Sequence, residues 1–173
     1  MTPGARNGLI IAAIHLALIG SLGGKLLADR AMHPRVWVRA APVDPNLPIR
    51  GRYVSLALEV DRFEKMDPVR DAPAYLAGRP TLPVRLSVRD GQLVAEGSAD
   101  VAGASGSVVH RGDRQVVRLA PVAFFIPESV ADPSVRQPGE ELWVEVSVPP
   151  RGAPRPIRLG VKKDGTLTPL DLR

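Results

Sequence analysis

The chain begins with a long apolar segment and then changes to short stretches in which apolar and polar residues alternate. Residues 8–24, GLIIAAIHLALIGSLGG, are interrupted only by His15 and Ser21. Extended through Leu27, the segment has about 20 residues, which at a rise of about 1.5 Å per helical residue matches a hydrocarbon core of roughly 30 Å. The pattern predicts a single membrane span over about Gly8–Leu27, and it lacks the polar face of a helix on a soluble domain.

Two other interpretations of this segment remain open. A cleaved signal peptide would have a shorter apolar region and a small-x-small cleavage site, whereas LLADRAMH follows here, with Asp29 and Arg30 at the positions concerned. A buried helix of a soluble protein is the third interpretation. We expect residues 1–30 to form an uncleaved anchor and residues 31–173 to form one soluble domain.

The orientation of the anchor is not fixed by its flanking charges. The basic residues after the span (Lys25, Arg30, Arg35 and Arg39) outnumber Arg6 and the amino terminus before it. The positive-inside rule, taken literally, keeps the C-terminal domain in the cytoplasm. A short N-terminal anchor in front of one domain commonly exports that domain, and we therefore expect the domain on the periplasmic or extracellular side.

Alternation with a period of two predicts β-strands through most of the remaining chain. The stretches are RVWVRA, YVSLALEV, PVRLSVRDGQLVAEG, SVVHRGDRQVVRL, ELWVEVSV and PIRLGVKKDGTLTPL, with inward rows Val36, Val38, Ala40; Val54, Leu56, Leu58, Val60; Val84, Leu86, Val88; and Leu142, Val144, Val146, Val148. Asp90-Gly91 and Asp164-Gly165 are sequences typical of two-residue hairpin turns, and Gly112-Asp113 predicts a further turn. About eight or nine strands at this spacing favour a mainly β fold, an antiparallel sandwich or barrel-like domain. Residues 62–80 are the least strand-like region, and residues 127–140 are expected to form a proline-rich loop.

The amino-acid composition argues against several classes of function. The chain has no cysteine, which excludes disulfides, thiol catalysis and zinc-thiolate sites. Its 23 basic and 18 acidic residues are mixed along the chain, and this distribution gives no support to nucleic-acid binding. We expect no cofactor and no metal.

Candidate catalytic groups are scattered. A serine–histidine–aspartate arrangement could draw on Ser105 or Ser107, His110 and Asp113, but GASGS lacks the nucleophile elbow, and a Gly/Ser loop is the simpler interpretation. The three histidines (His15, His33 and His110) have no metal-ligand spacing. Glu59, Asp61, Glu64 and Asp67 are interleaved with Arg62 and Lys65, which predicts a solvated surface of mixed charge.

The stretch IRGRYVSLALEV, residues 49–60, resembles the GDYXXLXY family, named for the motif Gly-Asp-Tyr-x-x-Leu-x-Tyr. Gly51, Tyr53 and Leu56 match the motif, and Pro42, Asp44 and Pro45 match an upstream P-x-D-P. The chain departs from it at Arg52, where the motif has Asp, and at Leu58, where it has Tyr. Gly51 would allow a tight turn into a strand, and leucine at position 58 keeps an apolar side chain on the face of Leu56, so we expect the motif to serve the scaffold.

The resemblance implies a membrane-anchored bacterial protein without an assigned activity, and it suggests multi-span membrane proteins as partners. We expect a non-enzymatic accessory or interaction protein. The alternatives are a small-ligand-binding β domain and a membrane-tethered hydrolase, because the turn before Tyr53 also resembles one in signal-peptidase-like folds. Such an enzyme pairs serine with lysine, yet Ser55 lies in mid-strand, and Lys65, Lys162 and Lys163 are the only lysines beyond the anchor.

Overall fold

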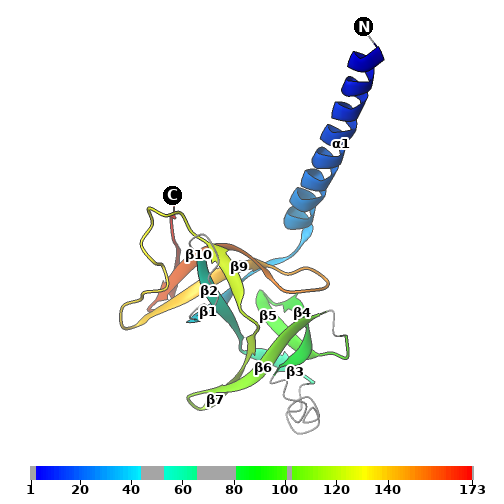
Figure 1. Ribbon diagram of the computed structural model, residues 1–173. Helices are drawn as coiled ribbons and strands as arrows, with labels where there is room; N and C mark the ends of the chain where they lie inside the picture. Colours follow the sequence, from blue (N-terminus) through cyan, green and yellow to red (C-terminus); the bar gives the residue numbers. More distant parts are fainter. Residues whose placement is uncertain (1–2, 44–52, 66–80, 101–102, 173) are drawn as a thin grey trace. The chain divides into compact units, whose positions relative to one another are not determined.

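The computed structural model describes residues 3–43, 53–65, 81–100 and 103–172, which contain one helix and eleven strands (Figure 1). The chain divides into two compact units, Met1–His33 and Pro34–Arg173. The elements are α1 (Pro3–Met32), β1 (Arg35–Val43), β2 (Tyr53–Val60), β3 (Arg62–Glu64), β4 (Leu82–Arg89), β5 (Gln92–Gly97), β6 (Ala104–Arg111), β7 (Arg114–Leu119), β8 (Val122–Phe125), β9 (Glu140–Ser147), β10 (Arg155–Lys163) and β11 (Thr166–Pro169).

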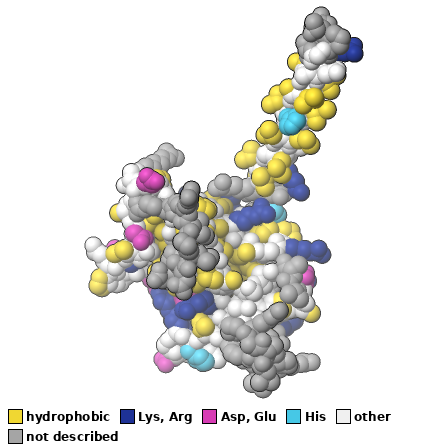
Figure 2. All heavy atoms as spheres, in the orientation of Figure 1, with side chains coloured by type: hydrophobic (Ala, Val, Ile, Leu, Met, Phe, Trp, Pro, Cys, Tyr) yellow, Lys and Arg dark blue, Asp and Glu magenta, His cyan; other side chains and the backbone are white. Residues whose placement is uncertain are grey.

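The helix α1 is apolar on all sides. Its residues Arg6–Ala28 have a mean hydropathy of 1.8 and bury nothing inside the protein, so the segment is long and apolar enough to cross a membrane. Figure 2 shows hydrophobic side chains along the helix. Its two polar interruptions bond to the helix backbone: His15 Nδ1 lies 2.9 Å from the Ile11 carbonyl oxygen, and the Ser21 hydroxyl donates to the carbonyl of Leu18. Polar groups satisfied in this way are compatible with a lipid environment.

The second unit is one mixed sheet in the order β11-β10-β9-β1-β2-β7-β6-β4-β5-β3, with β8 also paired to β2. All pairs are antiparallel except β3 with β5. The sheet curls, so that β5 packs against β1 and β2 without being hydrogen-bonded to them. The mainly β prediction is confirmed, in the form of a single curled sheet.

The concave face of the sheet holds the core. Its fully buried side chains come from distant strands and include Leu56, Leu58, Val84, Val144, Val146 and Leu159. The inward rows predicted from alternation are therefore confirmed, with Val88 only partly buried. The predicted hairpin turns are also confirmed: Asp90 and Gly91 have φ values of 52° and 70°, and Asp164 and Gly165 have 49° and 83°, as a type I′ turn requires.

Two strands were not apparent from the pattern. β3 has only three residues and β8 only four, too few to display a period of two. β3 lies within the region 62–80 that had no strand-like pattern, and residues 66–80, including Asp67, lie outside the described residues. The expected loop over 127–140 is present as turns and irregular backbone before β9.

Candidate functional site

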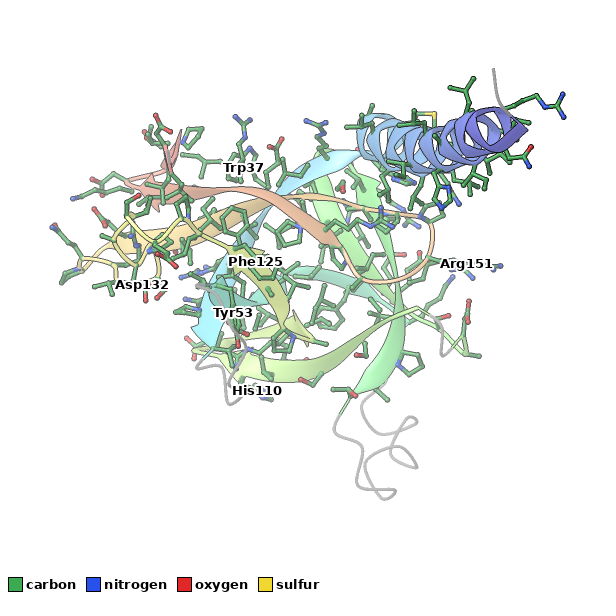
Figure 3. All side chains as sticks on the ribbon, turned by 45° about the horizontal axis from the view of Figure 1, so that its top comes forward. Trp37, Tyr53, His110, Phe125, Asp132 and Arg151 are labelled. Atoms are coloured by element: carbon green, nitrogen blue, oxygen red, sulfur yellow. The ribbon has the colours of Figure 1, made fainter. Side chains whose placement is uncertain are left out.

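The family motif is divided between the two faces of β2. Tyr53 begins the strand on the outer face, and its ring lies 6.1 Å from that of Phe125 on β8, at an interplanar angle of 52°. Figure 3 shows the two side chains next to one another. Leu56 and Leu58 are fully buried in the core. Gly51 and Arg52 lie outside the described residues. The leucine that replaces the motif's second tyrosine thus serves packing, as expected.

One acidic residue directly after the motif departs from its expected environment. Glu59 is only 4% exposed, although its neighbours in sequence predicted a solvated position. It lies on the outer face of β2, where strand pairing places Arg39 of β1 on one side and Arg118 of β7 on the other. The expectation of a solvated surface is wrong for Glu59. It holds in part for Glu64, which is half exposed and binds Arg89 at 3.2 Å.

Three arginines surround the buried carboxylate. Arg118 donates to Glu59 Oε1 at 3.0 Å, Arg111 donates to Oε2, and Arg39 Nε lies 3.9 Å from Oε2. Arg39 also binds Glu141 of β9 at 2.9 Å. These groups form an arginine clasp, by which we mean Glu59 with Arg39, Arg111 and Arg118. Because both carboxylate oxygens have charged partners, the clasp offsets the cost of burial and ties β1, β2, β6 and β7 together.

Both tryptophans lie on the same outer face as the clasp. The Arg158 guanidinium lies over the Trp37 ring, 5.3 Å from the ring centroid, and Lys162 Nζ lies over the Trp143 ring, 4.6 Å from its centroid. Arg158 also donates to Glu145 at 2.6 Å. Such cation–π contacts bury the aliphatic stems of basic side chains on the rings. Lys162 therefore has a packing partner that its position beside a turn did not predict.

Gly160 makes room for Trp37. A Cβ atom at position 160 would lie 2.9 Å from the Trp37 ring and 3.1 Å from the Thr168 carbonyl oxygen. We expect Gly160→Ala to displace the ring and weaken its contact with Arg158, lowering the free energy of unfolding by about 1–3 kcal/mol. A red-shifted tryptophan emission of the folded protein would report the displacement. Gly152→Ala, which meets no atom at its Cβ but has a φ of 88°, separates the steric effect from backbone strain.

The serine–histidine–aspartate arrangement, which the sequence did not favour, does not assemble, and Ser105 and Ser107 lie in strand β6 rather than in the expected Gly/Ser loop. Ser105 and Ser107 share one face of β6, and His110, an odd number of residues away, lies on the other. His110 instead lies within 3.2 Å of the Gln115 side chain, across the hairpin. The sequence RGD over 111–113 forms the hairpin turn, as predicted, and its arginine joins the clasp. Ser55 lies in mid-strand opposite Ala123.

Metal ligands are also dispersed in the part of the chain that the structure describes, where no group of three or more histidine, aspartate or glutamate side chains could hold an ion. A small groove of about 110 Å³ lies between the clasp and β5, and it includes Trp37, Trp143, Arg39 and Glu59 in its lining. That volume is well below the roughly 300 Å³ of small-molecule sites. The outer face thus presents a structural arrangement of paired charges and aromatic rings.

On the β4–β5 hairpin, Arg89 bridges two carboxylates. It binds Glu96 at 2.6 Å as well as Glu64. The hydrogen bond that Arg89 donates to Glu96 and the negative charge of Glu64 raise the pKa of Arg89 above its ordinary value. This charge pairing is peripheral and solvent-exposed, unlike that of Glu59.

Comparison with known proteins gives one family. Residues 16–159 match the GDYXXLXY protein family, which is more than four fifths of the chain and takes in most of the apolar helix and the strands β1 to β9. Neither the curated proteins nor the solved structures searched give a significant match. The motif residues Tyr53 and Leu56 lie within the matched region, as do all four members of the clasp. The chain belongs to the GDYXXLXY family.

Proposed function

We propose that the protein is a membrane-anchored, non-enzymatic accessory protein. Its β domain lies on the periplasmic or extracellular side of the membrane and binds a multi-span membrane protein. The observation that carries this proposal is α1, in which the 23-residue segment Arg6–Ala28 is apolar on average and has no residue buried inside the protein. A helix of this kind is stable where lipid or another apolar helix covers it. The β domain has its own core and needs no contribution from the helix.

The outer face of the β domain supports a role in interaction. The charged side chains on this face form ion pairs with one another, in the clasp and between Arg158 and Glu145. These ion pairs hold neighbouring strands together. Phe125, beside Tyr53, is 67% exposed, and exposed aromatic residues are enriched where proteins bind one another. A photo-crosslinking residue at position 125 should therefore capture a membrane protein in intact cells. The same residue at Val135, which is equally exposed on a loop, is the matched control.

Charges in the middle of the span should abolish membrane insertion. Leu18 and Leu22 are exposed apolar residues of α1, and each arginine near the centre of a span costs about 2.5–3.5 kcal/mol. We expect Leu18→Arg with Leu22→Arg to move the full-length protein from the carbonate-resistant membrane fraction to the soluble fraction. Val135→Arg, a change of the same chemistry on the β domain, should leave it in the membrane.

Reporter fusions at the C-terminus would test the orientation. If the domain is exported, a reporter that works only outside the cytoplasm is active, and a reporter that works only inside the cytoplasm is inactive. The reverse pattern would contradict the extracytoplasmic part of the proposal and leave the anchor intact. Membrane extraction and orientation are therefore tested separately.

A further inference from the structure

The apolar helix α1 carries one ionisable side chain near the middle of its membrane-crossing segment. Residues 8–24 have two polar side chains, His15 and Ser21. The midpoint of Arg6–Ala28 is Ala17, so His15 lies two residues, or about 3 Å along the helix axis, from the middle of the segment. In the proposed anchor this position is close to the centre of the bilayer, where polar side chains are costly and mark functional contacts.

The bond between His15 and Ile11 fixes which ring nitrogen carries the proton. A carbonyl oxygen can only accept a hydrogen bond, so Nδ1, which lies 2.9 Å from the Ile11 oxygen, is the N–H donor. In the neutral ring the other nitrogen, Nε2, is then a bare acceptor. Among the described residues nothing bonds to Nε2, and the side chain is exposed on the helix surface. His15 therefore presents one unsatisfied acceptor to the surroundings of α1.

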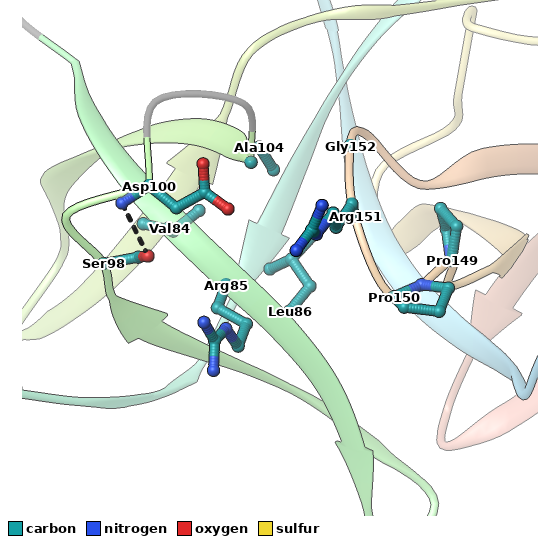
Figure 4. Close-up of a pocket in the computed structure, with 11 residues that line it drawn as sticks. Val84, Arg85, Leu86, Ser98, Asp100, Ala104, Pro149, Pro150, Arg151 and Gly152 are labelled. Atoms are coloured by element: carbon teal, nitrogen blue, oxygen red, sulfur yellow. Dashed lines mark hydrogen bonds between the residues drawn. The ribbon is translucent and has the colours of Figure 1, made fainter.

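An unsatisfied acceptor costs more in lipid than on the β domain. Figure 4 shows a pocket of about 290 Å³ on that domain, where the Asp100 amide donates to the Ser98 hydroxyl at 3.1 Å and the Arg151 side chain is exposed. Exposed polar groups of this kind can bind water. The hydrocarbon core of a membrane offers neither water nor another donor, so a hydrogen bond from a neighbouring helix would remove the cost of a bare Nε2.

A second copy of α1 does not supply that bond. Its own His15 would present the same bare Nε2, and two acceptors have no hydrogen to share. Its Ser21 hydroxyl already donates to the Leu18 carbonyl at 2.9 Å. The chemistry of the helix thus selects a different transmembrane helix, one that carries a hydroxyl or an amide N–H at the depth of His15.

We propose that a neutral donor side chain of the multi-span partner, a hydroxyl or an amide, binds His15 Nε2 near the middle of the membrane. The inference rests on the proposed function, because it requires α1 to cross the membrane beside that partner. Apolar side chains contact lipid and protein about equally well, whereas polar contacts of this kind favour association between helices. The anchor itself then takes part in recognising the partner.

The protonation of the ring is tested without the partner. Full-length protein with ¹⁵N-labelled histidine side chains is placed in phosphatidylcholine vesicles, where nitrogen NMR distinguishes protonated from bare ring nitrogens. The signals of His15 are those that disappear in His15→Phe. We expect a protonated Nδ1 and a bare Nε2. A protonated Nε2 would overturn the inference, because the ring would then have no acceptor for a neighbouring helix.

The contact itself is tested by photo-crosslinking in intact cells of the source organism. The crosslinking residue replaces Ile19, about 40° from His15 around the helix axis, or Ile10, about 140° away; both are exposed isoleucines of α1. Position 19 should give an adduct with a second membrane protein, and position 10 should give much less.

Variants of His15 then separate the acceptor from the ring. His15→Phe keeps a ring without nitrogen and should reduce the adduct at position 19 by about 3- to 15-fold, as expected for one hydrogen bond between helices in lipid. His15→Gln places an amide oxygen near the position of Nε2 and should retain the adduct. Ser21→Ala is the matched control and should leave the adduct unchanged, because the Ser21 hydroxyl donates within its own helix.

The other outcomes contradict the inference or the proposed function. An adduct that is unchanged in His15→Phe, is lost equally in His15→Gln, or consists of two copies of this chain contradicts the contact at His15. Carbonate extraction is measured for every variant, and a wild-type protein that leaves the membrane contradicts the proposed anchor. An anchored protein captured at position 125 but not at position 19 contradicts only the His15 contact, and one captured at neither position contradicts the proposed partner.

Discussion

Replacing Glu59 by glutamine is expected to lower the free energy of unfolding of the β domain by about 2–3 kcal/mol. The substitution keeps the size of the side chain but removes the negative charge, which leaves Arg39, Arg111 and Arg118 close together around a neutral amide. The arginines are partly exposed and water can solvate them in part, so the expected loss is smaller than for a fully buried pair. Urea denaturation in detergent, followed by tryptophan emission, would measure it, because Trp37 and Trp143 both lie in the β domain.

Glu64→Gln is the matched control for this prediction. Glu64 is also an acidic residue bound by arginine, but its side chain is 38% exposed. Surface ion pairs contribute little to stability, and we expect the denaturation midpoint to remain nearly unchanged. Equal midpoints for Glu59→Gln and Glu64→Gln would show that the clasp has no special role in stability.

Leu58→Ala is expected to destabilise the β domain by about 3 kcal/mol, within the 2–5 kcal/mol range of buried leucine truncations. Leu58 is fully buried and lies on β2 between β1 and β7, where neighbouring strands leave little room to close the cavity. The same denaturation experiment would measure the loss. Leu58→Met preserves most of the volume and should cost less than about 1.5 kcal/mol.

The residue that the family motif has at this position supplies a second comparison. Leu58→Tyr adds a ring and a hydroxyl to a site with no exposed surface, and overpacking of this kind costs about 1–3 kcal/mol. A neutral effect would mean that the core of this chain retains space for the motif's tyrosine. A loss comparable to that of Leu58→Ala would mean that the core has been repacked around leucine.

Local pattern was a good guide to which residues face the core and where the hairpins turn. The row Val54, Leu56, Leu58 and Val60 and the turn at Asp90-Gly91 depend on side-chain alternation and on backbone conformation, both of which are local properties. The order of the strands is not local. β1 pairs with β9, more than one hundred residues later, and no feature of either strand specifies that partner.

The clasp was missed for the same reason. In the sequence, Glu59 stands beside Asp61, Arg62 and Glu64, which suggests a hydrated surface. Its true partners come from β1 and from the β6–β7 hairpin, and only the register of Glu59 with Arg39 and Arg118 brings them together. A usable signal was present in the form of arginines at alternate, outward positions of strands expected to share a sheet. Sequence alone could not choose which of the chain's many arginines would meet this glutamate.

The central position of β1 has a consequence for biogenesis. β1 follows α1 almost directly, yet its hydrogen-bonding edge toward β9 stays open until residues 140–147 have emerged. Long-range pairing of this kind slows folding and leaves a nascent chain exposed to wrong pairing. Until residues 140–147 emerge, β1 would therefore depend on holdase chaperones, or on rapid synthesis of the rest of the chain, to avoid wrong pairing.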